Sequence, residues 1–156
     1  MTPSESPSDF GVDSRMWLCY LYVVAINIKK QIEYWLTTAE QDLASARRLL
    51  KSGKDLHWCL FFCHLTIEKY LKALTVKHTK DLAPRTHDLE KLAARSDLEL
   101  SIEEKDFLAE MTGYNLETRY PDEQLKIYKR ATTSVAKNLM KRTEEFVTWI
   151  RRLVKQ

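Results

Sequence analysis

The spacing of apolar and polar positions predicts helices along most of the chain. From Gln31 onward, apolar and small side chains recur every three or four residues, and Gly53 follows the last of them as a residue that commonly ends a helix. The repeating positions are Trp35, Ala39, Leu43, Ala46 and Leu50. Only three glycines and four prolines occur in 156 residues, too few for the many turns that a many-stranded sheet needs. The pattern therefore predicts an all-α protein.

A second helix is predicted to begin after Asp55, a plausible N-cap, and to run through His78. Its apolar residues lie on nearly every side instead of on a single stripe. They are Trp58, Leu60, Phe61, Phe62, Leu65, Ile67, Leu71 and Leu74. A helix of this kind is buried on most sides, so we expect it at the centre of the domain.

The next part of the chain predicts two further helices. A loop closed by Pro84 precedes a short helix, for which Thr86 or Asp88 is the expected cap. Ser101 and Glu104 then have the spacing of a capping box, so another helix is expected to start there and to run to about Arg119.

A proline-induced corner precedes the last predicted helix. Tyr120 comes before Pro121 and is pushed toward extended backbone, whereas Pro121 suits the first turn of a helix. That helix is expected to be about thirty residues long, or roughly 45 Å. Together these elements predict an antiparallel up-and-down bundle of four to five helices with a short accessory helix, formed by residues 31–156.

Residues 1–30 are predicted to lie outside this bundle. Residues 1–14 are rich in serine, proline and acidic residues and are expected to be a disordered tail. Residues 16–28 are an apolar run, expected to form a strand or a short helix against the domain or a second subunit, with a peripheral membrane contact as the alternative. The run is shorter than the roughly 20 residues that span a bilayer, and it lacks the basic start of a signal peptide. No stable membrane insertion is expected.

Charge is unevenly distributed, although the formal net charge is only +3. Residues 41–86 and residues 122–156 each contain nine Lys/Arg and four Asp/Glu, whereas residues 87–121 contain four and nine. The basic segments either form a phosphate-attracting face or are solvated helix faces that pair with other elements.

The three cysteines, an odd number in a chain with no secretion signal, indicate reduced thiols and a cytoplasmic protein.

Metal and cofactor chemistry find little support in the sequence. The segment HWCLFFCH offers His57, Cys59, Cys63 and His64, but ligands on one rigid helix cannot surround a tetrahedral ion. No glycine-rich phosphate loop, Gly-x-Ser-x-Gly elbow or His-Glu-x-x-His motif is present. We predict neither a metal site nor a bound cofactor.

Charged residues on the apolar second helix need a partner or a function. Glu68 and Lys72 have the favourable i,i+4 order, and Lys69 lies beside them. They form either a surface ion pair or a polar patch at a dimer seam or phosphate site.

His87, at the start of the short helix, can cap that helix, titrate or bind phosphate. Arg119, at the proline corner, can cap the carbonyls of the preceding helix.

Four stretches occur in an order that resembles a known family. They are YWLTTAEQDLASARRLL, HWCLFFCHLTIEKYLKAL, THDLEKL and TRYP, which together span about residues 30–152. The sequence resembles the HEPN (higher eukaryotes and prokaryotes nucleotide-binding) domain. The resemblance implies a helical bundle that forms a homodimer. It also implies a minimal nucleotidyltransferase as partner in a toxin–antitoxin-like pair.

The resemblance also implies two functional possibilities. Many relatives are metal-independent RNases with an arginine, four to six intervening residues and a histidine, but no arginine and histidine of this chain have that spacing. This departure favours a branch that binds nucleotide or RNA phosphate and is not an enzyme. Its implied ligand-binding residues are Glu68, Lys69, Lys72, His87, Arg119 and Tyr120. The guanidinium of Arg119 would bind a phosphate, and the ring of Tyr120 would stack on a base or a sugar.

The alternative is an RNase toxin with a rearranged site. Arg119 would stabilise the reacting phosphate, and His87 or Tyr114 would transfer the proton. The resemblance also implies a further option, in which Tyr114 or Tyr120 accepts a nucleotide from the partner.

Overall fold

The computed structural model describes residues 14–156, apart from the side chains of Ser14, Trp17 and residues 19–26. The predicted tail thus lies almost wholly outside the described residues. Within residues 14–156 the secondary structure is helical and no strand occurs, which confirms the all-α prediction. No helix in this part of the chain is long and apolar enough to cross a membrane.

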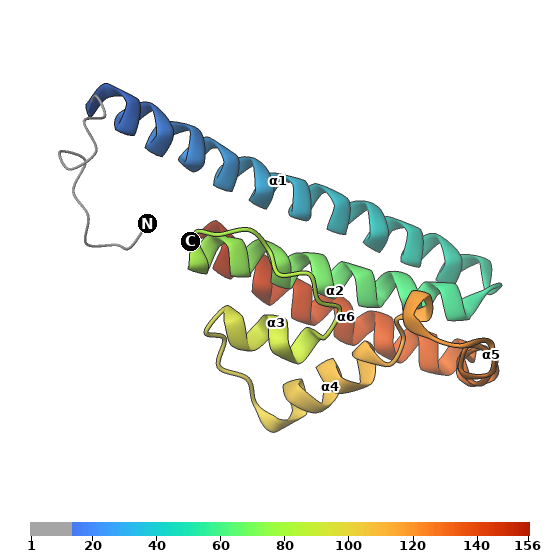
Figure 1. The fold of residues 1–156 in the computed structure, drawn as a ribbon. Helices are drawn as coiled ribbons and strands as arrows, with labels where there is room; N and C mark the ends of the chain where they lie inside the picture. Colours follow the sequence, from blue (N-terminus) through green and yellow to red (C-terminus); the bar gives the residue numbers. More distant parts are fainter. Residues whose placement is uncertain (1–13) are drawn as a thin grey trace.

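The chain folds as an up-and-down bundle. Its elements are α1 (Ser14–Ser52), α2 (Leu56–Thr79), α3 (Leu89–Arg95), α4 (Ile102–Thr112), the 3-10 turn η2 (Leu116–Thr118), α5 (Pro121–Arg130) and α6 (Thr133–Lys155). Helices α1 and α4 run in one direction and α2 and α6 in the other, while α5 lies at the end of the bundle where α1 turns into α2 (Figure 1). The predicted antiparallel bundle is therefore confirmed.

Helix α2 lies at the centre of this arrangement and packs against α1, α3, α4 and α6. Its buried side chains face several directions, as its apolar sequence predicts. Those of the core include Cys59, Leu60, Cys63, Ile67, Tyr70, Leu71 and Ala73. Two aromatic residues depart from the prediction, because the side chain of Trp58 is 43% exposed and that of Phe62 is half-buried.

The outer helices α1 and α6 each bury one stripe against α2. In α6 the buried positions recur at three- and four-residue spacing. They are Ala136, Leu139, Met140, Thr143, Phe146, Val147, Ile150 and Val154. In α1, Ala39, Leu43 and Ala46 are fully or almost fully buried, and the two alanines let α1 approach α2 closely.

The apolar residues 16–28 are part of α1 and form no separate element. The prediction of a strand or a short helix is therefore wrong. No glycine or proline interrupts residues 14–52, so the helical pattern beginning at Gln31 continues toward the N-terminus without a break. This end of α1 extends beyond the rest of the bundle (Figure 1). The side chains of Met16 and Leu18 there are 63% and 67% exposed.

Two predicted helices are shorter than expected. Helix α4 ends at Thr112 and not near Arg119, because Gly113 follows and the chain continues through a turn into η2. The predicted thirty-residue last helix is divided into α5 and α6. The division lies at Thr132, whose hydroxyl accepts a hydrogen bond from the N–H of Val135 and so begins a new helix.

The predicted caps are found at the starts of α3, α4 and α5, and the predicted N-cap position of α2 is confirmed without a capping hydrogen bond. Ser101 and Glu104 form the predicted capping box, Asp88 caps α3, and Pro121 starts α5 after an extended Tyr120. Asp55 does occupy the N-cap position of α2. Its backbone is left-handed, with φ of 52°, and its side chain makes no capping hydrogen bond.

Candidate functional site

Glu68 of α2 is the centre of a cluster of polar side chains that is buried except for His87. Its Oε1 accepts a hydrogen bond from Lys72 Nζ at 2.7 Å, and its Oε2 lies 3.1 Å from His64 Nε2 and 3.0 Å from His87 Nδ1. The side chains of Glu68, Lys72 and His64 are 5%, 9% and 0% exposed. We call these four residues the Glu68 cluster. The Glu68–Lys72 pair is thus buried and is not the surface ion pair that was one alternative.

Both ring nitrogens of His64 face acceptor oxygens. Its Nδ1 lies 3.0 Å from the carbonyl oxygen of Met111 at the end of α4, and its Nε2 faces Glu68. Through these two contacts His64 ties α2 to the end of α4 and lies against the carboxylate of Glu68.

Glu68 is held in its ionised form. Burial by itself raises the pKa of this carboxyl, but hydrogen bonds from His64, Lys72 and His87 together outweigh burial and lower the pKa from 4.5 to about 2. A carboxylate that stays charged inside a protein is stabilised by its donors. The donors come from α2 itself and from the loop before α3.

His87 is the member of the cluster that reaches solvent. It lies immediately before Asp88, whose carboxylate accepts from the N–H of Lys91 and fixes the start of α3. The side chain of His87 is 52% exposed. With Nδ1 donating to Glu68, the other ring nitrogen, Nε2, has no hydrogen-bond partner among residues 14–156. An imidazole oriented by a carboxylate in this way can accept a proton at Nε2 or bind an anion when charged.

The two lysines of the predicted patch lie in different environments. Lys72 is in the Glu68 cluster, where its ammonium also lies 4.9 Å from the ring centroid of Trp35 on α1. Lys69 pairs instead with Asp42 of α1 at 2.6 Å, and both side chains are largely buried. Lys69 therefore joins α1 to α2, and no described ion pair or hydrogen bond connects its side chain to Glu68.

Arg119 lies at a corner between η2 and α5. Its Nη1 is 3.8 Å from Glu123 Oε1, its Nε is buried with no hydrogen-bond partner among the described residues, and its side chain is 32% exposed. Gln124 Nε2 donates to the carbonyl oxygens of Leu116 and Arg119, both at 3.0 Å, and so fixes the corner. The expected capping of carbonyls by the Arg119 side chain is absent among the described contacts.

Three neighbours of Arg119 complete the corner. The Tyr120 ring is 77% exposed. Asn115 is only 2% exposed, yet neither polar atom of its side chain has a hydrogen-bond partner within the described part of the chain. Tyr114 is half-buried, and burial, assisted by Glu110 and opposed by Arg130, raises the pKa of its phenol. Its hydroxyl therefore stays protonated at neutral pH.

The structure brings together some of the predicted residues but not all. Glu68, Lys72 and His87 meet in the Glu68 cluster, whereas no described hydrogen bond, ion pair or ring contact joins Arg119 or Tyr120 to it. Sequence reasoning considered His64 only as a metal ligand. Its spacing of four residues from Glu68, continued by Lys72, was the available signal, since i,i+4 side chains meet on a helix.

A second polar network joins α1, α2 and α6. Glu40 accepts hydrogen bonds from the Tyr70 hydroxyl and from Arg151, and the Arg151 guanidinium also donates to the Tyr70 oxygen. Burial, opposed by Arg47, raises the pKa of Tyr70 to about 12. All three polar groups are engaged with one another, so this network serves to hold three helices together.

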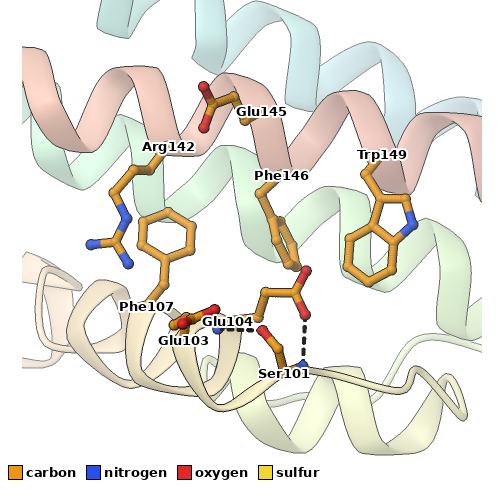
Figure 2. A pocket seen from close by; sticks show the side chains of 8 residues that line it. All are labelled: Ser101, Glu103, Glu104, Phe107, Arg142, Glu145, Phe146 and Trp149. Atoms are coloured by element: carbon orange, nitrogen blue, oxygen red, sulfur yellow. Dashed lines mark hydrogen bonds between the residues drawn. The ribbon is translucent and has the colours of Figure 1, made fainter.

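A hollow of about 320 Å³ lies between α4 and α6. Figure 2 shows Phe107, Phe146 and Trp149 along it, with glutamates at its edge. The acidic residues are Glu103, Glu104 and Glu145. The cation that lines it, Arg142, already pairs with Glu110 at 3.3 Å and lies 4.4 Å from the Phe107 ring centroid. The hollow is therefore poorly suited to a phosphate.

Within residues 14–156, no group of three or more His, Cys, Asp or Glu side chains is arranged to hold a metal ion.

A family model for the HEPN domain matches residues 32–153, which is most of the chain. The chain belongs to the HEPN family. The resemblance found in the four sequence stretches is thereby confirmed.

The remaining comparisons concern individual proteins. A search of the curated proteins found no match to this HEPN chain. Among solved structures, it is similar to TT1696 from Thermus thermophilus, with a TM-score of 0.65 and 20% sequence identity. The match covers 79% of this chain and 98% of TT1696. At this identity the likeness shows a shared fold.

Proposed function

We propose that this HEPN protein binds the phosphate of a nucleotide or of RNA at His87. The observation that carries the proposal is the contact between His87 Nδ1 and Glu68 Oε2 at 3.0 Å, which leaves Nε2 of a half-exposed ring without a described hydrogen-bond partner. The family's association with nucleotides supports the choice of ligand.

The surroundings of Glu68 make this arrangement effective. Because His64 and Lys72 also hydrogen-bond to Glu68, the carboxylate remains charged and keeps the His87 ring in one orientation. A protonated His87 would donate from Nε2 to a phosphate oxygen.

Arg119 and Tyr120 are proposed as a second contact for the ligand. The Arg119 guanidinium is only loosely paired with Glu123 at 3.8 Å, so it can turn to a phosphate, for which a planar guanidinium has suitable geometry. The exposed ring of Tyr120 offers a face to a base. Lys72, fully engaged with Glu68, and Lys69, paired with Asp42, act in this proposal by holding the site together.

We further propose a homodimer that acts with a minimal nucleotidyltransferase in a toxin–antitoxin-like pair, in the cytoplasm. The family membership supports the pair, and the buried free thiols of Cys59 and Cys63 suit a reducing compartment. Light scattering of the purified chain, alone and after co-expression with its genomic neighbour, tests both associations. A monomer that forms no complex with the product of the neighbouring gene would contradict both proposals.

The ligand part is tested by calorimetric titration with ATP at low salt. We expect His87→Ala and Arg119→Ala each to weaken binding by about tenfold, the effect of losing one charge-assisted hydrogen bond. His78→Ala and Arg48→Ala are matched controls at exposed positions and should bind like the wild type. Equal affinity in all five proteins would show that the ligand does not use this site.

A second candidate, an RNase with a rearranged site, is favoured by the same Glu68–His87 contact. An exposed imidazole oriented by a buried carboxylate is a suitable general base, and Arg119 would stabilise the reacting phosphate. Tyr114 is the weaker choice for proton transfer, because its pKa is raised. Incubation with a mixed RNA pool, read on a denaturing gel, decides the point. Cleavage by the wild type that both His87→Ala and Arg119→Ala abolish would establish the enzyme.

A further inference from the structure

We propose that two adjoining grooves, separate from the Glu68 cluster, bind single-stranded nucleic acid. The first groove, of about 600 Å³, lies between the end of α1 and the start of α6 and is lined in part by Lys51, Gly53 and Lys137. The second, of about 510 Å³, lies between the α1–α2 turn and the end of α5 and is lined in part by Gly53, Lys54 and Lys129. Gly53 lines both grooves, so they adjoin at the α1–α2 turn.

The charge of the grooves is positive. The four lysines are exposed, and none forms an ion pair among the described residues, although the chain has many acidic groups. Glu144 in the first groove is neutralised by Arg47 at 2.7 Å. Asp55 is then the one acidic residue that lines the grooves without an ion pair among the described contacts. The positive charge of the four lysines therefore attracts an anion to the grooves.

The start of α2 adds a second attraction for phosphate. Residues at the beginning of α2 line the second groove, and this helix has no side-chain cap. The first N–H groups of a helix have no partner within it, and the helix dipole makes that end positive. At α6, by contrast, Thr132 already caps the helix. The start of α2 thus has no described side-chain hydrogen bond that a phosphate oxygen would need to displace.

Aromatic rings lie beside the lysines. The ring centroid of His57 is 5.0 Å from that of Tyr128 and 5.5 Å from that of Trp58. Tyr128 is 58% exposed and Trp58 is 43% exposed. Exposed rings next to a cationic groove are the combination that binds single strands, since bases stack on the rings while phosphates follow the cations.

The distribution of the lysines favours a polymer over a mononucleotide. They come from α1, the α1–α2 turn, α5 and α6, so a single phosphate cannot meet all four. A duplex keeps its bases stacked inside and would leave the rings unused. This inference rests on the proposed function for its class of ligand, but it places the polymer on a different surface from His87.

The test is fluorescence anisotropy with a labelled oligouridine about 12 nucleotides long, from roughly 50 to 200 mM salt. A quadruple variant replaces the groove lysines by glutamine at positions Lys51, Lys54, Lys129 and Lys137. A control variant makes the same change at four exposed lysines elsewhere that also form no described ion pair, Lys30, Lys80, Lys105 and Lys155. Both variants lose equal net charge, so the comparison isolates the grooves.

We expect the groove variant to bind at least about tenfold more weakly at low salt, with the slope of log affinity against log salt reduced by about 3. The control variant should keep most of the affinity. Tyr128→Ala should weaken binding without changing the slope, because it removes a stacking surface and no charge. Circular dichroism of each variant confirms that it is folded.

Two results would overturn the inference: no RNA binding by the wild type at low salt, or equal losses in the groove and control variants. The ATP titration separates this failure from failure of the proposed function. If the groove variant still binds ATP while the oligouridine result is negative, the His87 site stands and the grooves do not bind nucleic acid. If the wild type does not bind ATP and the groove variant alone binds oligouridine more weakly, the grooves bind nucleic acid and the proposed His87 site is wrong.

Discussion

Replacing Glu68 by glutamine should destabilise the protein more than any exposed charge change. The substitution keeps the size of the side chain but removes the negative charge that His64 and Lys72 hold in the interior. The lowered pKa gives the size of the effect: a fall from 4.5 to about 2 corresponds to about 3 kcal/mol at neutral pH. Loss of one partner of a buried ion pair costs a similar amount.

The pH dependence gives this prediction a second test. The folded pKa of Glu68 is below the unfolded value, so its contribution is complete above about pH 4.5 and is lost as pH falls toward 2. The difference between wild type and Glu68→Gln should therefore shrink to roughly half at pH 3. Urea unfolding followed by circular dichroism at pH 7 and pH 3 measures both differences.

Glu145→Gln is the matched control for Glu68→Gln. Glu145 lies 3.9 Å from Lys141, and both side chains are well exposed. An exposed pair of this kind contributes little, so its loss should change stability by less than about 0.5 kcal/mol at either pH. At pH 7 the melting temperature should fall by about 6–12 °C for Glu68→Gln and hardly at all for the control. Equal urea midpoints for the two variants, or a Glu68→Gln deficit that does not change with pH, would refute the reasoning.

Three further predictions follow from packing, caps and backbone. Ile67→Ala removes a fully buried side chain from the centre of α2 and should cost about 2–5 kcal/mol in urea unfolding, whereas an effect below about 1 kcal/mol would mean that α2 is not central. Ser101→Ala and Thr132→Ala each remove a helix cap and should lower the free energy of unfolding by about 1 kcal/mol, measured by thermal melting. The control variants Ser101→Thr and Thr132→Ser keep the capping hydroxyl and should melt like the wild type. Gly53→Ala should cost about 1 kcal/mol although nothing lies within 4 Å of an added Cβ, because Gly53 has φ of +67°. An unchanged melting temperature would show that the turn relaxes.

Local rules let the sequence predict most of the secondary structure. Apolar residues on every side of residues 56–79 predicted a central helix, because a side chain repeats its direction every 3.6 residues. The caps at Asp88 and Ser101 and the start of α5 at Pro121 depend on neighbours within four residues. The ordered motifs were also enough to identify the HEPN family, which the family match over residues 32–153 confirms.

The weaker boundaries needed the tertiary structure. The helix pattern of residues 102–119 and 121–155 contains no strong breaker apart from Gly113 and Pro121, so periodicity alone predicted two long helices. In the fold, a turn after Gly113 and a cap at Thr132 divide them. The continuation of α1 through residues 16–28 was missed because an apolar run does not distinguish a strand from a helix.

The sequence by itself determined which residues carry charge, which helix is central and which pairs lie four residues apart. Only the tertiary structure decided that His87 meets Glu68 across nineteen residues of chain and that Lys69 faces Asp42 instead. It also decided that Lys51, Lys54, Lys129 and Lys137 border two adjoining grooves. The physical reason is that spacing fixes directions within one helix, whereas contacts between elements depend on the path of the loops and on the packing of whole helices.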